Sequence, residues 1–126
     1  FIANVNPLSV LTAWNVMRDR RDLEDAGEGW VWLDRRKTSR FRLDANGLVI
    51  AAERDGNPAD WVSCDPFEPV ADAAHHIYWA KPGTSLKAVM QAMHQSRTAP
   101  VALFDESSRF IGAIGVTEVL GAVLRR

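Results

Sequence analysis

The sequence predicts an α/β (α+β) fold, and three observations support this fold class. Residues 77–126 alternate continuous apolar runs with helical periodicity, residues 41–52 carry a hairpin pattern, and the prolines of residues 57–72 predict a junction between them. The chain has 126 residues, of which 47% are hydrophobic and 25% are charged, as in an ordinary globular protein. This length suits one compact domain, or two small repeats that share a core.

The first third of the chain carries weak structural signals. Residues 8–17 predict a strand or a short helix, and the polar segment 19–29 predicts a loop. Residues 30–33 predict a strand, because aromatic and β-branched residues favour extended backbone. We therefore expect this region to be less regular than the rest.

A hairpin is predicted over residues 41–52. Its strands flank Asn46 and Gly47, which both tolerate the positive φ angles of a tight turn. The same order of apolar strand, polar turn and strand with small residues returns over residues 101–116. The sequence therefore contains a weak internal repeat.

Residues 77–126 predict the order strand, helix, strand, strand, helix. A strand is expected over residues 77–80, and Thr84 is a suitable N-cap for a helix over residues 85–96. An apolar stripe at i, i+3, i+4 and i+7 predicts the buried face of this helix, formed by Leu86, Val89, Met90 and Met93.

Two strands and a second helix complete this half. Pro100 ends any preceding helix, and the apolar run 101–104 predicts a strand covered on both faces. Residues 110–116 predict the last strand. Residues 117–126 predict a helix with three inward side chains, Val119, Leu120 and Val123.

Charge and cysteine content limit the class of protein. The formal net charge is -1, so no global basic field favours nucleic acid as the main partner. The one cysteine, Cys64, excludes an internal disulfide, and no stretch approaches the roughly 18 apolar residues of a membrane span. Together with a start at Phe1 that lacks a signal-peptide pattern, these features predict a cytoplasmic piece of a larger protein.

Three segments of the second half resemble the CBS domain: residues 81–90, 99–106 and 109–114. CBS domains occur in tandem, and the resemblance implies two βαββα repeats that pack sheet to sheet into one CBS-pair (Bateman) module, often dimerised. Residues 1–72 would form a degenerate first repeat with an N-terminal linker, and residues 73–126 the second repeat. Because the polar segment 18–29 leaves little room for the first repeat's helix, we expect that repeat to be truncated.

The opening residues 1–13 are similar to the join between the nucleotide-binding domain and the CBS tail of ABC transporter ATPases that import glycine betaine, proline or choline. The similarity implies a regulatory, non-catalytic module of an osmoprotectant importer that senses adenine nucleotide or ionic strength and mediates dimerisation. Its partners would be a second copy, the ATPase domain of the same chain and the transporter's membrane subunit, with a cytoplasmic location peripheral to the inner membrane. Two alternatives are a structural dimerisation module with a decayed ligand cleft, and a small metal-dependent or thiol enzyme.

A nucleotide site is implied by the same resemblance. CBS domains that hold adenine nucleotides carry a Gly-apolar-apolar-Thr/Ser-x-x-Asp stretch, whose hydroxyl meets phosphate or ribose and whose carboxylate accepts the ribose hydroxyls. Here Gly115 stands in the hydroxyl position and Glu118 in the aspartate position, so one contact is lost and the other comes from a longer arm. The implied ligand is AMP, ADP or ATP, and the implied binding residues are Thr98, Ala99, Pro100, Gly112, Ile114, Thr117 and Glu118. In the alternative interpretation, the two glycines serve close packing and Glu118 stabilises a helix N-terminus.

The densest basic cluster is Arg35, Arg36 and Lys37, with Arg40 and Arg42 close by in the sequence. Such a cluster suits a nucleotide phosphate, a cyclic dinucleotide or an anionic membrane surface. A solvated hairpin face explains the same residues equally well. The sequence leaves these alternatives open.

Metal and thiol chemistry have weak support. The three histidines, His75, His76 and His94, lack the spacing of a metal site, and Cys64 lacks the partnered base that a nucleophilic thiol needs. Trp30 and Trp32 share one face of a strand, which suits core packing, an interface or a cage for a quaternary ammonium group. Core or interface packing is the commoner role of such a pair.

Overall fold

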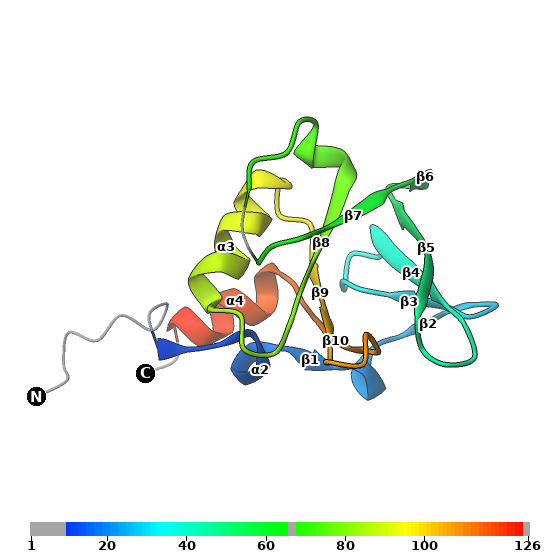
Figure 1. Cartoon of the computed structure of the whole chain (residues 1–126), viewed down its shortest axis with the longest axis horizontal. Coiled ribbons are helices and arrows are strands. Elements are labelled where there is room, and N and C mark those ends of the chain that lie inside the picture. The colour runs from blue at the N-terminus through cyan, green and yellow to red at the C-terminus, as the bar shows by residue number, and fades with distance from the viewer. Residues whose placement is uncertain (1–9, 66–67, 125–126) are drawn as a thin grey trace, which may run out of the picture.

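The computed structural model describes residues 10–65 and 68–124, which form a mixed α+β fold with two five-stranded sheets (Figure 1). The first sheet has the strand order β1 (Arg18–Asp19), β10 (Phe110–Ile114), β9 (Val101–Phe104), β8 (His76–Ala80) and β7 (Asp60–Ser63). The second sheet has the order β2 (Asp25–Gly27), β3 (Trp30–Trp32), β4 (Ser39–Leu43), β5 (Val49–Arg54) and β6 (Asn57–Pro58). The helices are α2 (Ala13–Val16), α3 (Leu86–Gln95) and α4 (Val116–Leu124), with 3-10 turns η1 (Arg20–Asp22) and η2 (Ala73–His75).

The α+β class predicted from the sequence is confirmed, as is the element order after residue 76. That order is β8, α3, β9, β10, α4, with β8 parallel to β9 and β9 antiparallel to β10. Residues 1–9, which carry most of the similarity stated above for residues 1–13, lie outside the described residues. The end of the helix predicted over residues 117–126, at residues 125–126, lies outside them as well.

The molecule has three layers, with α3 and α4 on one face of the first sheet and the second sheet on the other (Figure 1). Side chains of β9 alternate between the two faces, so Leu103 packs with the helices and Phe104 packs toward the second sheet. All four β9 residues are buried, as the continuous apolar run predicted. Leu86, Val89 and Met93 of the predicted stripe on α3 are buried as well.

Aromatic rings fill the space between the two sheets. Phe41 of β4 lies 6.1 Å from Phe104 and 6.0 Å from Phe110, measured between ring centroids. Phe104 and Phe110 are 5.8 Å apart. These distances are typical of favourable aromatic pairs, so the two sheets are joined by a continuous apolar core.

The first sheet takes strands from both halves of the chain. Its edge strand β1 pairs with β10, and at the opposite edge β7 pairs in parallel with β8. Residues 57–72, expected to be a junction, therefore contain the strands β6 and β7. The two halves share one sheet, and both contribute residues to each of the two apolar clusters on its faces.

Residues 19–29 are more ordered than the loop predicted for them. Asp19 accepts a hydrogen bond from the backbone N–H of Arg21 at 2.9 Å and so caps η1. Leu23 is buried between the sheets, and β2 follows. No α-helix lies between residues 18 and 63 of the described chain, as expected for a first half without room for one.

Several local details differ from the sequence predictions. The N-cap of α3 is Ser85, whose hydroxyl accepts from Ala88 N at 3.2 Å, whereas the predicted cap Thr84 is buried and accepts from Lys81 N. In the β4–β5 turn Gly47 has a positive φ and Asn46 does not, so the left-handed position of this turn is the one that Gly47 occupies. Leu120, predicted to point inward, is 52% exposed, since the buried stripe of α4 centres on Val119.

The hairpins β4–β5 and β9–β10 are equivalent in register. In the first, Leu43 pairs with Val49, and an extra residue then intervenes before the next pair. In the second, Phe104 pairs with Phe110 and the same irregularity follows. Each position of one hairpin corresponds to a position 61 residues later, so the internal repeat suggested by the sequence is present in the backbone.

Candidate functional site

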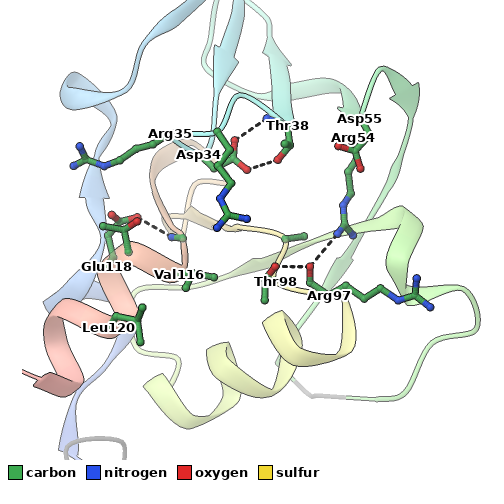
Figure 2. A pocket seen from close by; sticks show the side chains of 14 residues that line it. Asp34, Arg35, Thr38, Arg54, Asp55, Arg97, Thr98, Val116, Glu118 and Leu120 are labelled. Atoms are coloured by element: carbon green, nitrogen blue, oxygen red, sulfur yellow. Dashed lines mark hydrogen bonds between the residues drawn. The ribbon is translucent and has the colours of Figure 1, made fainter.

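A cleft of about 330 Å³ lies where the open ends of the two hairpins approach each other (Figure 2). Segments from both halves of the chain form its walls. The lining residues are Asp34, Arg35, Arg36, Thr38, Arg54, Asp55, Arg97, Thr98, Ala99, Gly115, Val116, Thr117, Glu118 and Leu120. The cleft therefore exists only when the two hairpins are packed together.

Four of the seven predicted nucleotide-binding residues line this cleft: Thr98, Ala99, Thr117 and Glu118. The other three, Pro100, Gly112 and Ile114, are buried and do not line it. Residues predicted at the start of β9 and at the start of α4 are thus brought together, although nearly twenty residues separate them.

Gly112 has a packing role that the structure makes explicit. A Cβ atom at this position would lie 2.3 Å from the backbone oxygen of Arg18 and 2.9 Å from Sδ of Met17. Only a residue without a side chain lets β1 approach β10 so closely. The close-packing interpretation of this glycine is therefore the one that its surroundings support.

Glu118 is held against the N-terminus of α4. Its Oε1 accepts a hydrogen bond from the backbone N–H of Gly115 at 2.8 Å, drawn as a dashed line in Figure 2. This contact satisfies a backbone donor that the helix leaves free and places a negative charge at the positive end of the helix. The carboxylate still lines the cleft, but one of its oxygens is already engaged.

The basic cluster divides between different surfaces. Arg35 and Arg36 line the cleft and are exposed, whereas Lys37 pairs with Glu24 at 3.1 Å. Arg40 bonds to Glu53 at 2.8 Å on the outer face of the second sheet. Only part of the sequence cluster is therefore available to a ligand in the cleft.

Sequence reasoning missed four charged cleft residues, Asp34, Arg54, Asp55 and Arg97. Arg54 donates from Nη1 to the carbonyl oxygen of His76 at 3.3 Å and from Nη2 to that of Arg97 at 3.4 Å. Burial lowers its pKa and outweighs the charges of Asp55 and Asp34, which raise it, while the charge of Arg97 adds to the lowering. The internal repeat was the available signal, because Arg54 corresponds to Gly115 of the predicted motif when the hairpins are aligned.

The wall formed by Arg97 and Thr98 has an unusual backbone. Both residues have positive φ angles, 56° and 65°, a region in which residues with a Cβ are strained. The consequence is that Thr98 and Ala99 turn toward the cleft directly after α3 ends. Local strain is often retained where it positions a functional surface.

The other residues considered for chemistry are placed elsewhere. Cys64 is fully buried, and burial raises the pKa of its thiol to about 12, so it is an inert core residue in this fold. Within residues 10–65 and 68–124, no group of three or more His, Cys, Asp or Glu side chains is arranged to hold a metal. The Arg40 guanidinium lies 4.3 Å from the Trp30 ring centroid and 5.4 Å from that of Trp32, so this tryptophan pair already contacts a cation.

None of the described helices is both long and apolar enough to cross a lipid bilayer. No known family model matches the chain, and no curated protein matches it in sequence. The case for a function therefore rests on the cleft and on the sequence resemblance.

Proposed function

We propose that this chain is a regulatory module of the CBS-pair type that binds an adenine nucleotide in the cleft between its two hairpins. On this proposal it belongs to the cytoplasmic ATPase subunit of an ABC-type importer of quaternary amines or proline, and acts as a dimer. Nucleotide binding, or a change in ionic strength, would shift the population between two packings of the module. The module itself carries out no bond chemistry.

One observation carries the proposal: the cleft joins predicted residues that lie far apart in the chain. Thr98 and Ala99 follow α3, Thr117 and Glu118 open α4, and Arg36 comes from the first half. A cleft that both repeats build is suited to regulation, because a ligand there contacts both hairpins at once. Its volume, about 330 Å³, falls at the lower end of ordinary small-molecule sites.

The cleft offers groups that suit a nucleotide. Thr98 and Thr117 supply hydroxyls, the free oxygen of Glu118 is an acceptor for ribose hydroxyls, and Leu120 adds an apolar wall. Arginine side chains supply positive charge for phosphate. Together these are the polar and apolar partners that an adenine nucleotide needs.

A second candidate is a structural dimerisation module whose ligand cleft has decayed. Two observations favour it. Gly115 supplies no hydroxyl where the family motif has one, and Glu118 already bonds to a backbone N–H. Under this alternative the same two residues serve only to start α4.

Isothermal titration of the purified chain with AMP, ADP, ATP and cyclic dinucleotides, at low and high salt, tests the proposal, with the molecular mass measured alongside. We expect micromolar binding that Glu118→Ala weakens at least about tenfold, the usual effect of losing a hydrogen bond to a charged group. Glu106→Ala, which removes a carboxylate from the exposed β9–β10 turn, is the control and should bind as the native chain does.

Each alternative predicts its own result. A stable dimer that binds none of these ligands would favour the structural module. Sedimentation with anionic lipid vesicles tests the membrane contact through Arg35, Arg36 and Lys37. Binding to the vesicles that Arg35→Gln and Arg36→Gln together abolish would assign these side chains to a membrane instead of to a nucleotide.

A further inference from the structure

We propose that Arg54 recognises a phosphate group of the bound ligand, and that it thereby makes the cleft prefer a nucleotide over the corresponding nucleoside. This inference rests on the proposed function and deepens it. It concerns a residue that lies outside the motif from which the site was predicted.

The position of Arg54 is the first argument. The residue ends β5, and its side chain points into the space between the hairpins, whereas Arg35 and Arg97 extend away to opposite sides (Figure 2). Its guanidinium reaches the main chain of Arg97, which adjoins the predicted site at Thr98. Four arginines line the cleft, Arg36 being the fourth, and in the described part of the chain Arg54 is the one whose guanidinium is fixed by hydrogen bonds.

The charge of Arg54 is the second argument. Its two hydrogen bonds go to carbonyl oxygens, of His76 and Arg97, which orient a guanidinium without neutralising it. In the described part of the chain, no carboxylate oxygen lies within 4.0 Å of its side-chain nitrogens. A half-buried cation without a paired anion is a favourable partner for an anionic ligand.

Two of the three carboxylates that line the cleft are engaged with other groups. Asp34 accepts hydrogen bonds from the backbone N–H of Thr38, at 2.9 Å, and from its hydroxyl. Glu118 accepts a hydrogen bond from the backbone N–H of Gly115 at the start of α4. The third acid, Asp55, acts on Arg54 through its charge, as Asp34 does, and both raise the pKa of the guanidinium. None of the three forms an ion pair with Arg54 within 4.0 Å in the described part of the chain.

The shape of the free donors is the third argument. A guanidinium carries five N–H groups in a planar fork, and two of its nitrogens each make one bond to a carbonyl oxygen here. The remaining N–H groups can meet two oxygens of one phosphate, a geometry that an ammonium group cannot provide. Phosphate is therefore the ligand group that Arg54 fits.

The experiment compares adenosine, AMP and inorganic pyrophosphate by isothermal titration of the native chain, Arg54→Gln and Arg54→Lys. We expect Arg54→Gln to weaken AMP and pyrophosphate binding about tenfold to hundredfold while changing adenosine binding less than about threefold. Arg54→Lys should fall in between, because it keeps the charge and loses the fork. The salt dependence of AMP binding should also become shallower in Arg54→Gln.

Arg42→Gln is the matched control, because it removes the same charge as Arg54→Gln. Arg42 is exposed on β4 and does not line the cleft. This variant should bind all three ligands as the native chain does. Thermal unfolding of each variant shows that it is folded, and Arg54→Lys carries the comparison if Arg54→Gln does not fold.

The outcomes separate this inference from the proposed function. If Arg54→Gln weakens the binding of adenosine and of AMP equally, or weakens neither, then Arg54 does not recognise phosphate. The proposed nucleotide site is not contradicted by that result. If pyrophosphate binds through Arg54 and adenosine adds nothing to AMP binding, the phosphate role stands and the adenine-nucleotide function fails. If no probe binds, both are overturned.

Discussion

Asp44 and Asp105, 61 residues apart, make the same hydrogen bonds in equivalent hairpin turns. The Oδ1 atom of Asp44 accepts from the backbone N–H groups two and four residues later, those of Asn46 and Leu48, at 2.8 and 2.9 Å. Asp105 accepts from Ser107 and Arg109 in the same pattern, both at 2.9 Å. The two turns are therefore built identically, although they share few residues.

Removing either carboxylate should destabilise the chain by a similar amount. Asp44→Ala and Asp105→Ala each lose two hydrogen bonds to the backbone, so we expect each to lower the free energy of unfolding by about 1–2 kcal/mol. Urea denaturation measures both. Asp44→Asn and Asp105→Asn keep an acceptor oxygen and should cost less; equal losses for Asn and Ala would show that the acceptor is not what stabilises the turn.

Gly112 allows a direct test of packing against ligand binding. Gly112→Ala places a methyl group against the backbone of Arg18, so we expect the free energy of unfolding to fall by about 1–3 kcal/mol, as for other overpacked sites. Gly83→Ala, where a Cβ meets nothing within 4 Å, is the control and should change stability by less than about 0.5 kcal/mol. Native stability of Gly112→Ala with lost nucleotide binding would instead assign Gly112 to the ligand site.

The hairpin repeat explains why the structure has no α-helix between residues 18 and 63 of the described chain to cover the outer face of the second sheet. Val101 and Ile114 form a cross-strand pair in the first sheet and are buried under α3 and α4. The equivalent pair in the second sheet is Arg40 and Glu53, which form an ion pair only 28% and 27% exposed. A charged pair, whose guanidinium lies over two indole rings, stands in place of the apolar pair that would need a helix to cover it.

Placing an apolar pair at Arg40 and Glu53, as at Val101 and Ile114, should make this outer face associate with other copies of the chain. We expect Arg40→Val combined with Glu53→Ile to increase the apparent mass of the chain, or to precipitate it, because an apolar sheet face is then left without cover. Light scattering over a range of concentrations measures this. The exchanged pair, Arg40→Glu with Glu53→Arg, keeps both charges and should retain the native mass; a native mass for the apolar pair too would mean that this face tolerates exposure.

The fold was predictable for those elements whose buried face shows as a pattern within their own sequence. The 3.6-residue stripe of α3 and the continuous apolar run of β9 are patterns within the segment, so both elements were predicted. The strands β1, β2 and β6 have two or three residues each, and an exposed or half-buried pattern that no local period reveals. Their pairing partners, which the sequence does not display, make them strands.

The same distinction applies to the cleft. Glu118 and its neighbour Thr117 were predicted from a resemblance to a short motif at the start of α4, which is a local feature of the sequence. Arg54 is held at the cleft by tertiary contacts, its hydrogen bonds to the carbonyl oxygens of His76 at the start of β8 and of Arg97 after α3. Lys37, predicted with its neighbours as part of a ligand cluster, is instead turned by its positive φ of 58° toward a pair with Glu24.

Cys64 should make stability fall at alkaline pH. Burial raises its pKa to about 12 from an ordinary value near 9, so the native state keeps the thiol proton over a range in which the unfolded chain has lost it. The unfolded state then binds fewer protons, and the stability that Cys64 contributes is complete below about pH 9 and is lost as the pH rises toward 12. Between pH 8 and pH 10 we expect the free energy of unfolding of the native chain to fall by about 1.4 kcal/mol more than that of Cys64→Ala, as measured by urea denaturation.

The thiol of Cys64 should also resist a disulfide reagent at pH 8 until urea unfolds the chain. Rapid labelling of the folded protein, or parallel pH profiles for the two chains, would contradict the buried, protonated thiol.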